Sequence, residues 1–276
     1  MSLLTSLVLT VIPDKSVTLP AYLARAVYRF FLEDIAKYDS QFSQALHDNT
    51  RRKPFTCSTV FGGTRLENDS QEFTPDNPAW LRITGLTQVI SNHLQRMANQ
   101  PPDTIELDGV SFQVTSATVD NQQHQWAGQT TYEALVTEHI ARRRPRATLQ
   151  IEFASPTTFR MTGKHKQTRS WPVPMPEWVF GSLYRQWNLF SPTGMDSRLL
   201  DFVQEFVVLS RYQLSTRAIP GKNKIPQMGC VGQAIYALIA EDAWQANQLH
   251  ILSDFAFYSG IGYQTTTGLG QSRRSI

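Results

Sequence analysis

Three side chains near the start of the sequence could together cleave a phosphodiester bond. His47 carries an imidazole that titrates near neutral pH and can transfer protons. Lys53 follows six residues later and offers a positive charge for a phosphate, and Tyr28 offers a phenolic hydrogen-bond donor. A ribonuclease without a metal needs a base for the 2′-hydroxyl, an acid for the leaving 5′-oxygen, and a cation or donor for the phosphorane. Taken singly, His47 also fits an exposed loop residue, and Tyr28 a core residue of an amphipathic helix.

A glycine-rich segment, residues 259–271, is a candidate for anion binding. Two Gly-x-Gly pairs, Gly260 with Gly262 and Gly268 with Gly270, flank a polar stretch. Glycine adopts positive φ at little cost, so the backbone N–H groups of such a segment can converge on an anion. The segment is neither a Walker A loop nor a dinucleotide-binding fingerprint. A tight turn or flexible loop after a helix is the alternative.

Basic residues are concentrated in the second half of the sequence. Residues 1–145 contain 13 Lys or Arg and 15 Asp or Glu, whereas residues 146–276 contain 13 and 8. This excess indicates a polyanionic partner. Lys164 and Lys166, around a histidine, could form a phosphate-binding patch or a solvated loop.

Composition excludes several classes of protein. The chain has 276 residues, of which 41% are hydrophobic, so it can form one large or two small cores. It contains no apolar run of the length that spans a membrane, and its first residues lack the features of a signal peptide. Its two cysteines, Cys57 and Cys230, form neither a disulfide framework nor a zinc motif. We therefore expect a cytoplasmic protein without metal or cofactor.

The elements that must position these residues follow a repeated pattern. The first half is predicted to contain a strand (2–12), a helix starting at Pro20, a polar segment (39–52) with His47, strands (55–61, 80–84), a helix (86–97) and a hairpin (104–108, 110–119). The second half is predicted to contain a strand (147–153), helices (176–190, 197–207), a hairpin (207–218, 227–238) with a basic tip, a helix (243–258) and the glycine-rich segment. Each half matches the split β-α-β order. The sequence therefore predicts an α+β protein of two tandem ferredoxin-like (RRM-like) domains, residues 1–141 and 142–276, joined by a basic linker.

Taken together, these features resemble the CRISPR repeat-processing endoribonucleases of the RAMP superfamily. The resemblance covers most of the chain, and the glycine-rich segment near the C-terminus is its most specific part. The matching residues are Leu19-Pro20, Tyr22-Leu23, Tyr28, Leu46-His47, Lys53 leading into Phe55-Thr56-Cys57-Ser58, Leu149-Gln150-Ile151-Glu152-Phe153-Ala154-Ser155-Pro156-Thr157, and the glycines from Gly260 to Gly270.

The resemblance implies a substrate and a reaction. Members of the family cleave precursor RNA within the CRISPR repeat without metal and leave a 2′,3′-cyclic phosphate, generating guide RNAs. By this resemblance His47, Tyr28 and Lys53 are catalytic, although Arg51 and Arg52 could face the phosphate in place of Lys53. The glycine-rich segment (Gly260, Gly262, Gly268, Gly270) would bind or order the RNA backbone. The basic hairpin, with Arg217, Lys222 and Lys224, would grip an RNA stem.

Two other functions remain open. A catalytically silent RAMP subunit would hold guide RNA among other interference subunits, and it would not need His47 beside a phosphate. An unrelated RNA-recognition module is disfavoured because the aromatic RNP motif is absent. The sequence does not distinguish a monomer from a homodimer.

Overall fold

The computed structural model describes residues 2–49, 52–67, 69–162, 168–219 and 226–275. Within this part, the chain forms two compact units, Leu3–Thr130 with Thr266–Gly268, and Thr131–Thr265 with Leu269 onward. Among the described residues, no helix is long and apolar enough to cross a membrane. Five of the predicted RNA-binding residues lie outside the described ranges: Arg51, Lys164, Lys166, Lys222 and Lys224.

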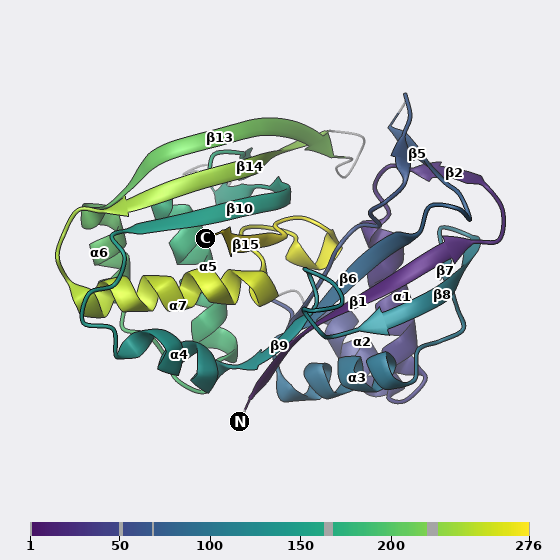
Figure 1. Ribbon diagram of the computed structural model, residues 1–276, viewed down its shortest axis with the longest axis horizontal. Coiled ribbons are helices and arrows are strands. Elements are labelled where there is room, and N and C mark those ends of the chain that lie inside the picture. Colours follow the sequence, from purple (N-terminus) through teal and green to yellow (C-terminus); the bar gives the residue numbers. More distant parts are fainter. Residues whose placement is uncertain (1, 50–51, 68, 163–167, 220–225, 276) are drawn as a thin grey trace. The chain divides into compact units, whose positions relative to one another are not determined.

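The N-terminal unit is built on an antiparallel sheet with the order β3-β6-β1-β8-β7, to which β9 adds beside β1 (Figure 1). Its helices pack on one face of this sheet. The strands are β1 (Leu3–Pro13), β3 (Phe55–Cys57), β6 (Ala79–Gly85), β7 (Thr104–Leu107), β8 (Val110–Thr118) and β9 (Gly128–Thr131), and the helices are α1 (Ala24–Ala36), α2 (Ser40–Asp48) and α3 (Gln88–Asn99).

Alternating side chains of the central strands form the core of this unit. Leu7 and Leu9 of β1 and Leu81 and Ile83 of β6 are fully buried and belong to one hydrophobic cluster with residues of α1 and α3. Residues in between, such as Trp80, point to the opposite face because successive side chains of a strand alternate. The sheet therefore has one face covered by helices and a second face that carries Trp80 and the other alternate side chains.

The structure corrects two predictions in this half. Pro20 does not begin a helix: it ends strand β2 (Val17–Pro20), which pairs with β5 (Ser70–Phe73), itself paired with β4 (Thr64–Arg65). The polar segment 39–52, for which no helix was predicted, contains α2, whose first turn is capped by the Asp39 side chain, which accepts from the Phe42 amide at 2.8 Å. The predicted hairpin is confirmed, since Asp108 and Gly109 have φ of 52° and 80° between β7 and β8.

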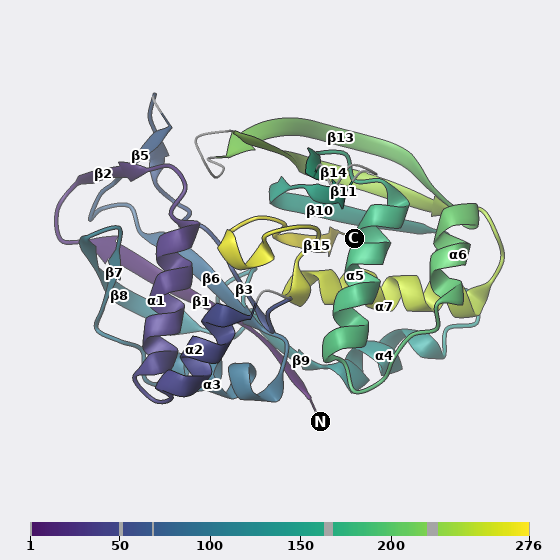
Figure 2. The same cartoon turned by 180° about the vertical axis from the view of Figure 1, so that it is seen from behind.

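The C-terminal unit repeats the same plan with the strand order β13-β14-β10-β15 (Figure 2). A short hairpin, β11 (Phe159–Thr162) with β12 (Thr168–Trp171), follows β10. The other elements are α4 (Tyr132–Ile140), β10 (Thr148–Thr157), α5 (Pro176–Phe190), α6 (Arg198–Phe206), β13 (Val207–Ile219), β14 (Gln227–Leu238), α7 (Ala243–Ser259) and β15 (Ser272–Ser275).

In the N-terminal unit, β1 lies between β6 and β8, and β3 is at the edge. In the C-terminal unit, β10 lies between β14 and β15, and β13 is at the edge. This is the order of a ferredoxin-like fold, so the predicted pair of ferredoxin-like domains is confirmed. The sequence analysis placed residues 132–140 in the first domain, whereas α4 packs on α7 and clusters with the second. The last strand is short but present, pairing with β10 from Gln150 to Phe153.

Candidate active site

Lys53 holds the end of the helix that carries His47. Its ammonium donates to the carbonyl oxygen of His47 at 3.0 Å and also to that of Leu46. The last carbonyls of a helix lack partners within the helix and lie at the negative end of its dipole, so a lysine is a suitable cap there. Burial lowers the pKa of Lys53, and Asp48 partly opposes this shift.

Tyr28 lies on α1 beside the same ammonium. The Lys53 Nζ atom lies 5.5 Å from the centroid of the Tyr28 ring, which stacks on Phe55 with 5.9 Å between centroids. Burial, followed by the nearby Cys57, raises the pKa of Tyr28, so its phenol stays protonated at neutral pH. Tyr28 therefore packs against the core and also presents a donor, which combines the two sequence interpretations.

His47 lies in the last turn of α2, and its side chain is exposed. Within the described part of the chain, its imidazole forms no hydrogen bond or ion pair. The helix itself is fixed to α1, because the Ser43 hydroxyl donates to the Leu32 carbonyl at 2.7 Å. The structure thus brings Tyr28, Lys53 and the backbone of His47 together and leaves the imidazole free. Arg52, predicted beside them, is half-buried.

The four predicted glycines permit close approaches between backbone segments. All have positive φ, from 62° at Gly260 to 89° at Gly262. A Cβ at Gly262 would lie 2.5 Å from the Thr158 oxygen, and one at Gly270 would lie 2.0 Å from the Ile261 oxygen. These distances allow no side chain.

The amides of three of these glycines are used inside the protein. Gly260 donates to Ala256 and Gly270 to Pro156, while Gly262 donates to the Ser182 hydroxyl at 3.0 Å. These three amides therefore do not form the free anion-binding cluster that the sequence pattern suggested. RNA binding by this segment stays a prediction, and groups of the segment other than these three amides would have to make the contacts.

The tip of the glycine-rich segment, Thr266–Gly268, belongs to the N-terminal unit. Tyr22 donates its hydroxyl to the Thr267 carbonyl at 2.6 Å, and a Cβ at Gly268 would lie 2.4 Å from the Cβ of Ala24. Burial strongly raises the pKa of Tyr22, which keeps this donor protonated. The sequence analysis assigned Tyr22 no role of its own, because only a fold could reveal a partner 245 residues away.

Arg217 is the part of the predicted basic hairpin that the structure describes. It is exposed on β13, opposite Gly229 of β14. It lines a cavity of about 660 Å³ with Glu152, Gln213 and Gln233. The lining thus combines the Arg217 guanidinium with side-chain amides and the Glu152 carboxylate, which is paired with Arg273.

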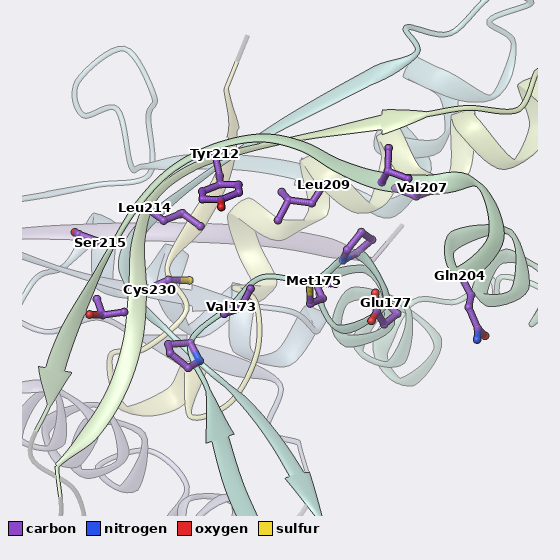
Figure 3. A pocket seen from close by; sticks show the side chains of 14 residues that line it. Val173, Met175, Glu177, Gln204, Val207, Leu209, Tyr212, Leu214, Ser215 and Cys230 are labelled. Atoms are coloured by element: carbon purple, nitrogen blue, oxygen red, sulfur yellow. The ribbon is translucent and has the colours of Figure 1, made fainter.

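A second cavity, of about 1180 Å³, lies between β13 and the start of α5 (Figure 3). Val173, Met175, Leu209 and Tyr212 line it, with Glu177 as its charged member. None of the predicted catalytic or RNA-binding residues lines this cavity. None of the described residues that line it is basic, so they offer no cation for a phosphate.

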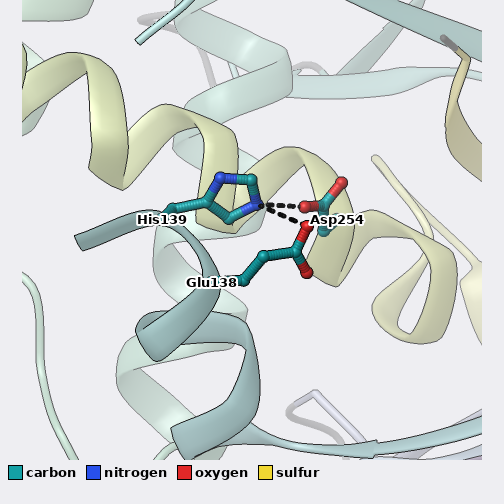
Figure 4. A group of neighbouring side chains, drawn as sticks. All are labelled: Glu138, His139 and Asp254. Carbon is teal, nitrogen blue, oxygen red and sulfur yellow. Dashed lines mark hydrogen bonds and ion pairs between the residues drawn. The ribbon is translucent and has the colours of Figure 1, made fainter. Parts of the chain in front are cut away.

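One described cluster has side chains that could ligate a metal: Glu138, His139 and Asp254 (Figure 4). The His139 Nε2 atom is hydrogen-bonded to Asp254 and lies 4.0 Å from a Glu138 oxygen. Arg274 already approaches both Asp254 oxygens at 3.4 Å, so a cation occupies the position beside the carboxylate. This arrangement fits an ion-pair network that joins α4 to α7.

Comparisons with known proteins show the family of the chain. The family described as CRISPR Cas6 N-terminal domain matches residues 3–137, and that described as CRISPR-associated endoribonuclease Cas6 matches residues 151–272. No curated protein matches the chain significantly.

Solved Cas6 structures have the same architecture over the full length. A Thermus thermophilus Cas6 in a product complex is 25% identical, with a TM-score of 0.81 and 100% of each chain covered. A second Thermus Cas6 in a product complex is 26% identical, with a TM-score of 0.76, covering 99% of this chain and 100% of that one. That second protein with a substrate mimic is 25% identical, with a TM-score of 0.73 and 99% of each chain covered. Because both family domains match in order and together span most of the sequence, the chain belongs to the Cas6 family of CRISPR-associated endoribonucleases.

Proposed function

We propose that this endoribonuclease cuts CRISPR precursor RNA within the repeat without a metal ion, leaving a 2′,3′-cyclic phosphate. The observation that supports this reaction is the cluster formed by Lys53, the Tyr28 ring and the last turn of α2, which carries His47. The cluster offers an exposed imidazole, a cation and a protonated phenol within one domain. Those are the groups that RNA cleavage by an internal nucleophile requires.

In the proposed reaction the 2′-oxygen forms a bond to phosphorus while the bond from phosphorus to the 5′-oxygen breaks. One group removes the proton of the 2′-hydroxyl, and another gives a proton to the leaving 5′-oxygen. His47 performs one of these transfers, because an imidazole can act as base or acid near neutral pH. Lys53 stabilises the negative charge on the phosphorane, and Tyr28 donates a hydrogen bond to it.

CRISPR repeat RNA is the proposed substrate. The related Cas6 structures were determined with product and with a substrate mimic. In this chain, Arg217 extends from the β13–β14 hairpin, and Lys222 and Lys224 follow in the sequence. We propose that this hairpin contacts the RNA backbone, which would make binding dependent on salt concentration.

The test is cleavage of the host repeat RNA by purified protein in EDTA. We expect cleavage, and a product whose 3′ end resists phosphatase until acid opens the cyclic phosphate. His47→Ala should cut about 10²–10⁴-fold more slowly and bind repeat RNA as before, because general acid–base groups contribute that much. Lys15→Ala is the control, since it removes an exposed lysine that is not part of the cluster. A strict requirement for Mg²⁺ would refute the proposed mechanism.

The alternative is a silent RAMP subunit that holds guide RNA. It would bind repeat RNA without cutting it, and His47→Ala would then change nothing. The free imidazole on a helix end capped by Lys53 favours the enzyme over this alternative.

A further inference from the structure

Three aromatic rings of the N-terminal domain contact one another, and none of them belongs to the proposed catalytic residues. The Phe61 and Trp80 rings are stacked with 4.4 Å between centroids and 24° between planes. The His124 ring contacts that of Trp80 at a tilt, with 4.7 Å between centroids and 57° between planes. All three side chains are half-buried, so each keeps part of its surface open to solvent. We call Phe61, Trp80 and His124 the ring stack.

The backbone fixes the first two rings. Phe61 and Trp80 form an isolated β-bridge, in which each amide donates to the other's carbonyl at 2.8 and 2.9 Å. Gly62 turns the chain directly afterwards with φ of 102°, and a Cβ there would lie 2.9 Å from the Pro78 oxygen. The rings are therefore held in place before any ligand arrives, which lowers the entropic cost of binding.

The ring stack lies on the sheet face that the helices leave uncovered. Trp80 alternates with the buried Ala79 and Leu81, so it points away from the helical core. Its neighbours across the sheet are Thr10 of β1 and then Ser116 of β8. In RNA-recognition modules, aromatic side chains on the open face of a four-stranded sheet stack on unpaired bases.

His124 adds a hydrogen-bond donor. Its Nδ1 accepts from the Trp126 amide at 3.1 Å, which places the ring proton on Nε2. Burial, followed by the positive charge of Arg82, lowers the pKa of His124, so the ring is neutral at physiological pH. Within the described part of the chain, Nε2 has no partner. A neutral ring with a free donor can stack on a base and bond to one of its acceptors.

The surrounding loop supplies amide groups. Residues 120–126 read Asp-Asn-Gln-Gln-His-Gln-Trp, and Asn121, Gln122 and Gln123 are exposed. The loop is ordered by its own hydrogen bonds, since the backbone amide of Gln122 donates to the Asp120 carboxylate and that of His124 donates to the Asp120 carbonyl. Side-chain amides match the edges of bases, which offer both donors and acceptors.

We propose that the ring stack binds an unpaired base of the substrate RNA, outside the paired stem. This inference rests on the proposed RNA substrate and adds a site to it. The open face of an end ring, His124 or Phe61, stacks on the base, and Trp80 supports both. Stacking is tolerant of sequence, so the site favours an unpaired nucleotide over a paired one, with selectivity left to His124 and the amides.

The test compares two RNAs, a repeat with its unpaired flank and the stem-loop alone, in binding to protein that carries His47→Ala. Trp80→Ala and His124→Ala are expected to weaken binding of the flanked RNA by about 5- to 150-fold and to leave stem-loop binding unchanged. The salt dependence should stay the same, because stacking releases no counterions. Trp80→Phe should retain affinity, and Trp244→Ala is the control for loss of an exposed tryptophan, which is 57% exposed.

Abasic substitution along the flank locates the base. At one position of the flank, we expect loss of the base to weaken binding to the protein that retains Trp80 and to have no effect on binding to the Trp80→Ala variant. If both alanine variants are folded, as judged by thermal melting, and bind the flanked RNA with parental affinity, the ring stack is not a base site. If the wild type cleaves repeat RNA but shows no preference for the flank, only this inference fails. If the wild type neither binds nor cleaves repeat RNA, the proposed function fails with it.

Discussion

Replacing Lys53 by methionine separates its two expected contributions, one to the stability of the fold and one to the rate of RNA cleavage. The ammonium donates to two carbonyls at the end of α2 and lies over the Tyr28 ring. A net hydrogen bond contributes about 0.5–1.5 kcal/mol, and a cation at a helix C-terminus about 0.3–1 kcal/mol. Because Lys53 is half-exposed, solvent screens these terms, and we expect a loss of roughly 1–2 kcal/mol in unfolding free energy.

The effect of Lys53→Met on cleavage should be larger than its effect on stability. Removing one group that stabilises negative charge in a transition state slows catalysis by about 10²–10³-fold. A protein destabilised by roughly 1–2 kcal/mol stays mostly folded when its stability is of the usual 5–15 kcal/mol. Loss of rate therefore cannot come from unfolding.

The assay pairs urea unfolding with single-turnover cleavage at saturating protein. Lys53→Arg retains the charge and should recover part of both properties, while Lys15→Met should change neither. Wild-type cleavage by Lys53→Met would refute the electrostatic role. Wild-type stability would refute the cap on α2.

Three further predictions follow from single positions. Gly268→Ala places a Cβ 2.4 Å from that of Ala24, at a residue with φ of 88°. We expect it to lower the unfolding free energy by about 1–3 kcal/mol, measured by thermal melting. Gly109→Ala is the control and should lower it less, because Gly109 also has positive φ but a Cβ there meets nothing within 4 Å. Arg217→Ala should weaken RNA binding and lower the salt-dependence slope by about 0.7–0.9, whereas an unchanged slope would exclude a phosphate contact. Burial is the main cause that lowers the pKa of His250 to about 4 in the folded chain. Between about pH 6.5 and pH 4, His250 is therefore protonated in the unfolded chain and neutral in the folded chain. Urea midpoints should therefore fall as pH drops from 6.5 towards 4, and His250→Asn should flatten that dependence.

Elements with a strong local signal were predictable from the sequence. Helix α5 has the bounds that were predicted from its apolar spacing. The Asp108-Gly109 hairpin was recognisable because this pair favours the required positive φ. Helix α2 was missed because it buries few residues, and its stability comes from the Asp39 cap and the Ser43 bond to α1.

The proposed site was predictable only as a set of residue types. The sequence named Tyr28, His47 and Lys53, and the structure places Lys53 against the other two. That Lys53 reaches the backbone of His47 depends on the end of a helix that the pattern did not reveal. The ring stack escaped notice because Phe61, Trp80 and His124 lie on three separated segments, joined only by sheet pairing and a loop.

The assignment of Thr266–Gly268 to the N-terminal domain has a consequence for how the protein is made. Those residues leave the ribosome after almost all of both domains, and β15, which completes the second sheet, follows them directly. The last three residues of the first domain are therefore synthesised only after most of the second domain. A gene cut at the domain border would yield an N-terminal half without the hydrogen-bond acceptor of Tyr22. The Tyr22 hydrogen bond therefore forms only after most of both domains has been synthesised, and an N-terminal fragment could regain it only by binding this segment of a co-expressed C-terminal fragment.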